Sequence, residues 1–72
     1  MKVIAQFQKN ALETVKAQTG EYNGHPIIDF RVWIENKEGK QVATKKGLTI
    51  SPESLEDFYE LVKTTVEASK LG

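Results

Sequence analysis

The sequence predicts an α+β fold in which a four-stranded antiparallel sheet precedes a single C-terminal helix. Residues 27–36 alternate between apolar and polar side chains, which is typical of a strand. Polar segments rich in Asn and Gly separate this stretch from its neighbours, as hairpin connections do. Ser51-Pro52 then opens a stretch whose apolar residues recur at helical spacing. Hairpins followed by one helix make an α+β domain.

The strand at residues 27–36 has the clearest pattern. One face would carry Ile28, Phe30, Val32 and Ile34, and the other would carry Asp29, Arg31, Trp33 and Glu35. The apolar face predicts contact with a core. Arg31 and Trp33 on the opposite face need another explanation, because tryptophan gains free energy from burial.

The other strands are expected at residues 3–7, 11–22 and 41–50. Residues 11–22 are ambiguous, because the spacing of their first apolar residues also suits a helix. From Val15 onward, however, Val15, Ala17 and Thr19 alternate with polar residues, which favours a strand. In the last strand, Gly47 follows two lysines and indicates a β-bulge.

The helix is expected at residues 52–69. Ser51 is a favourable N-cap, and Pro52 suits the first helical position. At 1.5 Å per residue this helix is about 27 Å long, so its apolar face exceeds what one small sheet can cover. We expect core and dimer contacts from its apolar stripe, which consists of Leu55, Phe58, Tyr59, Leu61, Val62 and Val66.

The size of the chain also predicts a homodimer. Its 72 residues form one domain, 1–72, which is too small to bury a large core. The chain has no cysteine and a single histidine, His25, so neither disulfides nor a metal site are expected. Oligomerisation is the remaining source of buried surface. Neither a signal peptide nor a membrane-spanning stretch is visible, and we expect a cytoplasmic protein without membrane contact.

The residues needed for catalysis are not found together. The glycines are isolated at turns rather than gathered in a phosphate-binding loop, and His25 lies in a turn beside Pro26. Asp29 and Glu35 are about 20 Å apart along a strand, too far for an acid–base pair. We therefore predict no enzymatic activity, no catalytic residue, no metal and no cofactor.

The charge is divided unequally along the chain. Residues 1–50 carry eight basic and five acidic side chains, a net charge of +3, whereas residues 51–72 carry two and five, a net charge of −3. A basic sheet with exposed aromatic residues is suited to single-stranded nucleic acid, because rings stack on bases and cations contact phosphates. The alternative is that both regions are ordinary solvated surfaces.

The order of motifs after residue 21 resembles the family of the transcriptional coactivator positive cofactor four. The resemblance covers Tyr22 to about Glu60 and rests on Tyr22-Asn23-Gly24, Ile28-Asp29-Phe30-Arg31 with Trp33 beyond, Glu38-Gly39-Lys40, and Lys46-Gly47-Leu48-Thr49-Ile50 before the helix. It implies a prokaryotic or phage member of that family, a dimer whose two curved sheets present grooves to single-stranded DNA. The implied function is non-sequence-specific binding in transcription, replication or recombination, with replication or transcription proteins as further partners.

The resemblance also implies a set of nucleic-acid-binding residues. Tyr22 and Trp33 would stack on bases, and Lys46 takes the place of the lysine before the glycine. The full set is Tyr22, Asn23, His25, Arg31, Trp33, Lys40, Lys45 and Lys46, with Lys16 and Lys9 as further basic residues. Asn23 and His25 stand where the family favours lysines, Val42 stands where a lysine is typical, and Glu13 falls near another basic position. These departures imply either a lower affinity or a modified role for this surface.

Other interpretations of the same residues remain open. Arg31 can pair with Asp29 or Glu35 on the sheet face, and Trp33 can lie in the dimer interface. Lys45 and Lys46 can protect a strand edge against aggregation. The alternative functions are a single-stranded RNA binder and a protein-interaction dimerisation module that uses the Arg31–Trp33 face.

Overall fold

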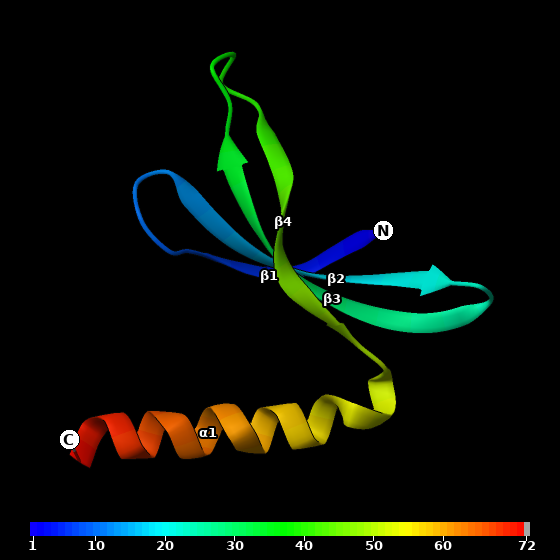
Figure 1. Cartoon of the computed structure of the whole chain (residues 1–72), viewed down its shortest axis with the longest axis vertical. Helices are drawn as coiled ribbons and strands as arrows, with labels where there is room; N and C mark the ends of the chain where they lie inside the picture. The colour runs from blue at the N-terminus through cyan, green and yellow to red at the C-terminus, as the bar shows by residue number, and fades with distance from the viewer. Residues whose placement is uncertain (72) are drawn as a thin grey trace.

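The computed structural model describes the backbone of residues 1–71 and the side chains of residues 1–70. The elements, in chain order, are β1 (Lys2–Gln8), β2 (Glu13–Tyr22), β3 (His25–Glu35), β4 (Gln41–Ile50), a short 3-10 helix η1 (Pro52–Ser54) and α1 (Leu55–Leu71). The strands pair antiparallel in the order β1-β2-β3-β4 (Figure 1). The predicted α+β fold, with four antiparallel strands before a C-terminal helix, is confirmed.

The ambiguous segment, residues 11–22, divides into the end of the β1–β2 loop and the strand β2. Asn10 shapes the loop, because its Oδ1 accepts hydrogen bonds from the backbone N–H groups of Leu12 and Glu13, both at 2.9 Å. Such side-chain contacts compete with helix formation. β2 then starts at Glu13, so the alternation from Val15 onward indicates the structure better than the helical spacing before it.

The β2–β3 connection is a two-residue turn. Tyr22 and His25 pair across it, and Asn23 and Gly24 both have positive φ angles, of 51° and 79°. Asn-Gly is the pair that a type I′ hairpin turn prefers, since both residues tolerate this conformation. The turn sets the register of the whole β2–β3 ladder and carries this hairpin beyond the rest of the sheet (Figure 1).

The predicted bulge is present in β4. Arg31 pairs with Gly47 and Trp33 with Ala43, so the three residues Thr44 to Lys46 lie opposite the single residue Val32. Gly47 is needed at the end of this bulge because a Cβ atom there would collide with the carbonyl oxygen of Phe30 and approach the Cα atom of Arg31 to 2.9 Å. Only glycine permits so close an approach of two backbones.

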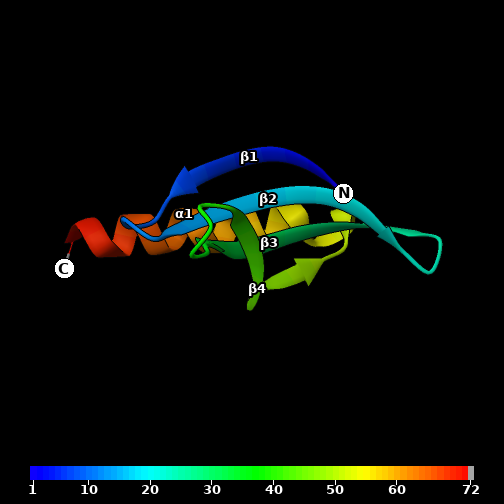
Figure 2. The same cartoon turned by 90° about the horizontal axis from the view of Figure 1, so that it is seen from above.

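One face of the sheet is apolar and lies toward the helix. On this apolar face the registers bring together Phe7, Val15, Ala17, Phe30, Val32 and Leu48. Phe30 meets Phe58 of α1 with the ring centroids 4.8 Å apart. Figure 2 shows α1 running beneath the strands along this side.

The helix begins differently from the prediction. Ser51 has an extended backbone and makes no side-chain capping bond; its backbone carbonyl accepts the N–H of Ser54 instead, at 3.0 Å. Pro52 opens a 3-10 turn, and the α-helix starts only at Leu55. Ser51 and Pro52 therefore take the N-cap and first helical positions as predicted, but the side-chain bond typical of an N-cap serine is not formed, because the tighter first turn satisfies the backbone by itself.

The chain is open rather than closed around a core. Within the described residues no apolar side chain is buried, and Phe7 is 62% exposed although it lies on the apolar face. The radius of gyration is 14.1 Å, whereas a compact domain of this length has a value near ~11 Å. The apolar face and the helix stripe are thus only partly shielded in the single chain.

Candidate nucleic-acid interface

The face of the sheet that points away from α1 is polar. We call it the polar face and define it by Thr14, Lys16 and Gln18 of β2, Asp29, Arg31 and Trp33 of β3, and Ala43 and Thr49 of β4. The register places Lys16 opposite Arg31 and Thr14 opposite Trp33. Residues paired in this way share one side of the sheet. Arg31 and Trp33 therefore lie together on the face opposite the apolar one, as the alternation predicts.

Trp33 is half-buried at one end of the polar face, between Thr14 of β2 and Ala43 of β4. The ammonium group of Lys16 lies 4.3 Å from the centre of its ring, a cation–π contact. Its partner on β4 is the small residue Ala43. The indole Nε1–H of Trp33 is buried without a hydrogen-bond partner in the described part of the chain. The indole is held from one side and bordered by a small residue on another, an arrangement that suits stacking.

Asp29 and Arg31 form the most ordered contact on this face. Arg31 donates from Nε to Asp29 Oδ2 at 3.0 Å and from Nη2 to Asp29 Oδ1 at 2.8 Å, while Thr49 Oγ1 donates to the same Oδ1 at 2.9 Å. Asp29 is only 3% exposed. The Arg31 guanidinium, followed by the Thr49 hydroxyl, holds the pKa of the Asp29 carboxyl below its ordinary value, although burial opposes this.

The lowered pKa of Asp29 predicts an acid-sensitive contribution to stability. The unfolded state takes up the proton first, so the contribution is complete above the ordinary pKa of about 3.9 and is lost as the pH falls toward the folded-state pKa. We expect Asp29→Asn to lower the free energy of unfolding by about 1–3 kcal/mol at pH 7. In urea unfolding, this difference should shrink below about pH 4.

The control for this experiment is Glu38→Gln, which removes the same charge from the exposed β3–β4 turn. A difference between wild type and Asp29→Asn that stays constant from pH 7 to pH 3 would contradict the role assigned to the carboxylate.

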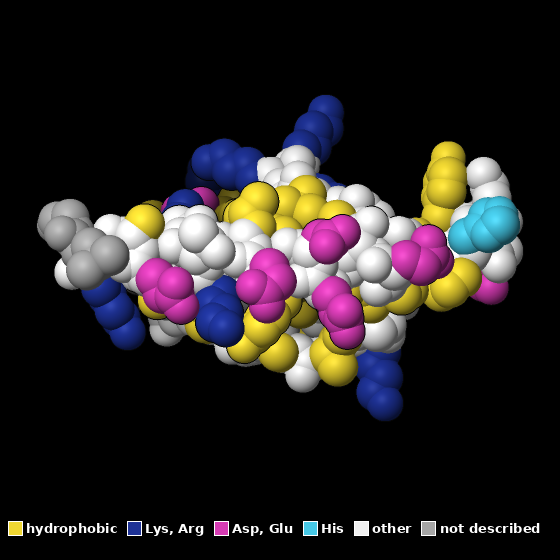
Figure 3. All heavy atoms as spheres, turned by 90° about the horizontal axis from the view of Figure 1, so that it is seen from below, with side chains coloured by type: hydrophobic (Ala, Val, Ile, Leu, Met, Phe, Trp, Pro, Cys, Tyr) yellow, Lys and Arg dark blue, Asp and Glu magenta, His cyan; other side chains and the backbone are white. Residues whose placement is uncertain are grey.

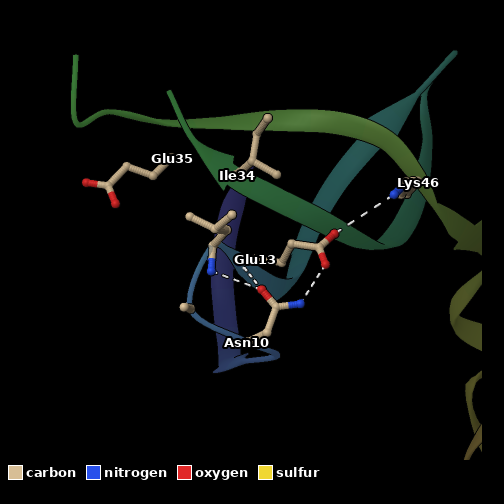
Figure 4. A pocket seen from close by; sticks show the side chains of 7 residues that line it. Asn10, Glu13, Ile34, Glu35 and Lys46 are labelled. Carbon is tan, nitrogen blue, oxygen red and sulfur yellow. Dashed lines mark hydrogen bonds and ion pairs between the residues drawn. The ribbon is translucent and has the colours of Figure 1, made fainter. Parts of the chain in front are cut away.

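Three basic or amide side chains gather around Glu13, away from Trp33. Asn10 Nδ2 donates to Glu13 Oε1 at 2.7 Å, Lys9 Nζ lies 3.3 Å from the same oxygen, and Lys46 Nζ lies 4.0 Å from Oε2. Figure 4 shows Lys46 and Asn10 both directed at Glu13 in a pocket that Ile34 also lines. The hydrogen bonds from Asn10 and then Lys9 lower the pKa of Glu13.

The remaining predicted residues lie toward the two ends of the sheet. Tyr22, Asn23 and His25 are exposed at the tip of the β2–β3 hairpin. His25 is eight residues from Trp33 along β3, or about 26 Å. Lys40 is exposed in the β3–β4 turn, where its backbone N–H donates to Asn36 Oδ1 at 3.0 Å. Lys45 is exposed in the bulge.

The structure thus brings together Lys16, Arg31 and Trp33, but it places Lys9 and Lys46 around Glu13. The stacking of Lys16 on Trp33 and the role of Glu13 as a common partner were missed by the sequence analysis. Both depend on the strand registers, and the only sequence signal for them was the polar alternation of β2.

The outer surface of the helix is acidic. Glu53, Glu56, Asp57, Glu60 and Glu67 all lie exposed on η1 and α1. Figure 3, which views the molecule from the helix side, shows a row of acidic side chains along this surface. The negative charge of residues 51–72 therefore lies on the opposite side of the molecule from Lys16 and Arg31.

Neither a metal-ion cluster nor a membrane-spanning helix is found in the described residues. They contain no group of three or more histidine, aspartate or glutamate side chains placed to hold a metal ion. Their helices are also too short or too polar to cross a bilayer.

Comparisons with known proteins agree with the fold. The family model described as Transcriptional Coactivator p15 (PC4) matches residues 9–61. The chain is similar to the orthorhombic crystal structure of a PC4 homologue from Burkholderia pseudomallei K96243, with 30% identity, a TM-score of 0.77, and coverage of 99% of this chain and 92% of the other. The tetragonal crystal structure of the same homologue is 29% identical, with a TM-score of 0.74 and coverage of 94% of this chain and 96% of the other. No curated protein sequence matches the chain.

The family model spans most of the sheet and the first part of the helix, and the solved structures share the same arrangement over nearly the whole chain. The motifs from Tyr22 onward, the four-stranded order and the single C-terminal helix all fit one family. The chain is a member of the PC4 family.

Proposed function

We propose that this protein binds single-stranded DNA without strong sequence preference, as a homodimer, through the polar face of the sheet. The observation that supports this most directly is the half-buried Trp33 under the Lys16 ammonium, beside Arg31. A flat ring with a lysine ammonium against it offers stacking for a base and positive charge for a neighbouring phosphate. Membership of the PC4 family supports the same function.

The accessible surface of the chain supports a dimer. It exposes 5837 Å², whereas a folded monomer of 8.1 kDa exposes roughly 4,500 Å². The excess of about 1,300 Å² per chain corresponds to about 2,600 Å² for a pair, within the range of obligate homodimers. The apolar face and the stripe of α1 are the surfaces available for this burial. Two sheets would then carry a charge of about +6, twice the +3 of residues 1–50.

The direct test measures the fluorescence anisotropy of labelled oligomers at two salt concentrations. We expect binding to oligo-dT that weakens as salt rises, because counterions are released from the strand, and much weaker binding to duplex DNA. Equal or tighter binding to single-stranded RNA would favour the RNA-binding alternative. Absence of salt-dependent binding to any oligomer would favour a protein-interaction module and contradict the proposal.

The bulge lysines provide a prediction within this test. Changing Lys45 and Lys46 together to Ala should weaken oligo-dT binding and flatten the slope of log K against log salt by about two, because each of the two phosphate contacts contributes close to one. The fold should persist, since exposed lysines contribute little to stability. The measurement is a salt titration of the variant beside the wild type.

Lys63→Ala with Lys70→Ala is the matched control. It removes the same charge from α1, on the far side of the molecule. If the bulge variant keeps the wild-type slope, or if the α1 variant loses as much, the bulge lysines do not contact the strand.

A further inference from the structure

A chain of hydrogen bonds links the centre of β3 to the bulge of β4. The Asp29 carboxylate holds Arg31 through two bonds, from Nε and Nη2. The third nitrogen, Nη1, donates to the backbone carbonyl of Thr44 at 3.0 Å. Each nitrogen of the guanidinium therefore already has a partner within the protein, and the side chain is 26% exposed.

Thr44 is the first residue of the bulge, where the regular ladder is interrupted. Its Oγ1 donates to the carbonyl of Val32 at 2.8 Å and accepts the backbone N–H of Lys46 at 3.1 Å. Bulged residues lose their ladder bonds and need other contacts to hold one conformation. Arg31 and the Thr44 hydroxyl supply such contacts, and both hold Thr44 in place. Lys45 and Lys46 come directly after Thr44 in the chain.

We propose that Arg31 is a positioning residue: held by Asp29, it fixes the Thr44 carbonyl and thereby the bulge that presents Lys45 and Lys46 to the strand, rather than contacting a phosphate itself. This inference rests on the proposed function. Lys45 and Lys46 are the freer cations, since Lys45 is exposed and the Lys46 side chain is 74% exposed, with its Nζ at 4.0 Å from the nearest oxygen of Glu13.

The two possible roles of Arg31 predict opposite effects for Asp29→Asn. If Arg31 contacts phosphate directly, loss of the Asp29 charge releases the guanidinium, and oligo-dT should bind more tightly with a steeper salt slope. If Arg31 positions the bulge, its anchor is weakened and binding should fall by roughly 3- to 10-fold. Arg31→Lys, which keeps the charge but loses the planar fork, should weaken binding to a similar extent.

Amide hydrogen exchange gives a readout that does not depend on DNA. In both variants the Lys46 N–H should exchange faster than in the wild type, because Thr44, whose hydroxyl accepts it, loses the contact of its carbonyl with Arg31 and keeps only the bond to Val32. Thr49→Val is the matched control: it removes one bond to Asp29 but leaves the Asp29–Arg31 pair and the bulge intact. Circular dichroism confirms that each variant is folded before binding is measured.

A double-mutant cycle completes the test. In a chain that already carries Lys45→Ala and Lys46→Ala, Arg31→Lys should have little further effect on binding, since Arg31 acts through those lysines. Tighter binding by Asp29→Asn, or an undiminished loss from Arg31→Lys in the lysine-free background, would overturn the inference. If the wild type itself does not bind oligo-dT, the proposed function fails instead, and the exchange experiment still reports whether Arg31 holds the bulge.

Discussion

Phe58→Ala should dissociate and largely unfold the protein. Phe58 supplies an aromatic contact between α1 and the sheet, with its ring 4.8 Å from that of Phe30. It also belongs to the apolar stripe that we assign to the dimer interface. Phe58 is half-buried in the single chain and would be buried in the proposed dimer. Replacing a buried aromatic side chain with alanine costs about 3–5 kcal/mol, and in a dimer the loss occurs in both chains. Sedimentation equilibrium and thermal unfolding measure the two effects.

The wild type should sediment at about 16 kDa, twice the chain mass of 8.1 kDa. Phe58→Leu is the control, because it keeps a large apolar side chain and should retain most of the stability. A wild type that is a stable monomer at micromolar concentration, or a Phe58→Ala protein that melts as the wild type does, would refute the assignment of this stripe to an interface.

Trp33→Ala should weaken oligo-dT binding by about 1–3 kcal/mol, which corresponds to roughly 5- to 150-fold in affinity. The ring lies on the polar face, away from Phe30 and Phe58, and its indole N–H makes no hydrogen bond in the described residues that would be lost. The melting midpoint should therefore fall much less than in Phe58→Ala. Competition binding and thermal unfolding test this pair of expectations.

Trp33 also reports on its own contact, because it is the only tryptophan in the chain. Stacked bases should quench its fluorescence on titration with oligo-dT. Trp33→Phe should recover much of the affinity, since stacking needs a flat π-face more than an indole N–H. If Trp33→Ala instead melts the dimer while the remaining dimer binds DNA normally, Trp33 belongs to the subunit interface.

The fold could be predicted because its main signals are local. The alternation around Phe30 and the Asn23-Gly24 turn each involve residues close in sequence, so the strand and hairpin could be inferred without knowing the register. The start of the helix was predicted less well. Ser51 has the residue type of a side-chain cap, but whether it forms one depends on the geometry of the turn that Pro52 begins.

The site was only partly predictable because it depends on contacts between strands. Alternation placed Arg31 and Trp33 on one face, but the position of Lys16 over Trp33 follows from the β2–β3 register. Gly47 indicated a bulge without revealing how many residues it contains. Because the bulge contains three residues, the Thr44 carbonyl lies within hydrogen-bond distance of Arg31. The sequence alone could not show this contact.

The absence of buried apolar side chains from the described part of the chain affects how the protein folds. A chain that shields so little apolar surface by itself gains little free energy from folding alone. In the proposed homodimer, folding and association then become a single bimolecular reaction, governed by mass action. The cellular concentration of the chain would set the fraction that is folded at all, so dilution would remove both the native structure and the paired sheets.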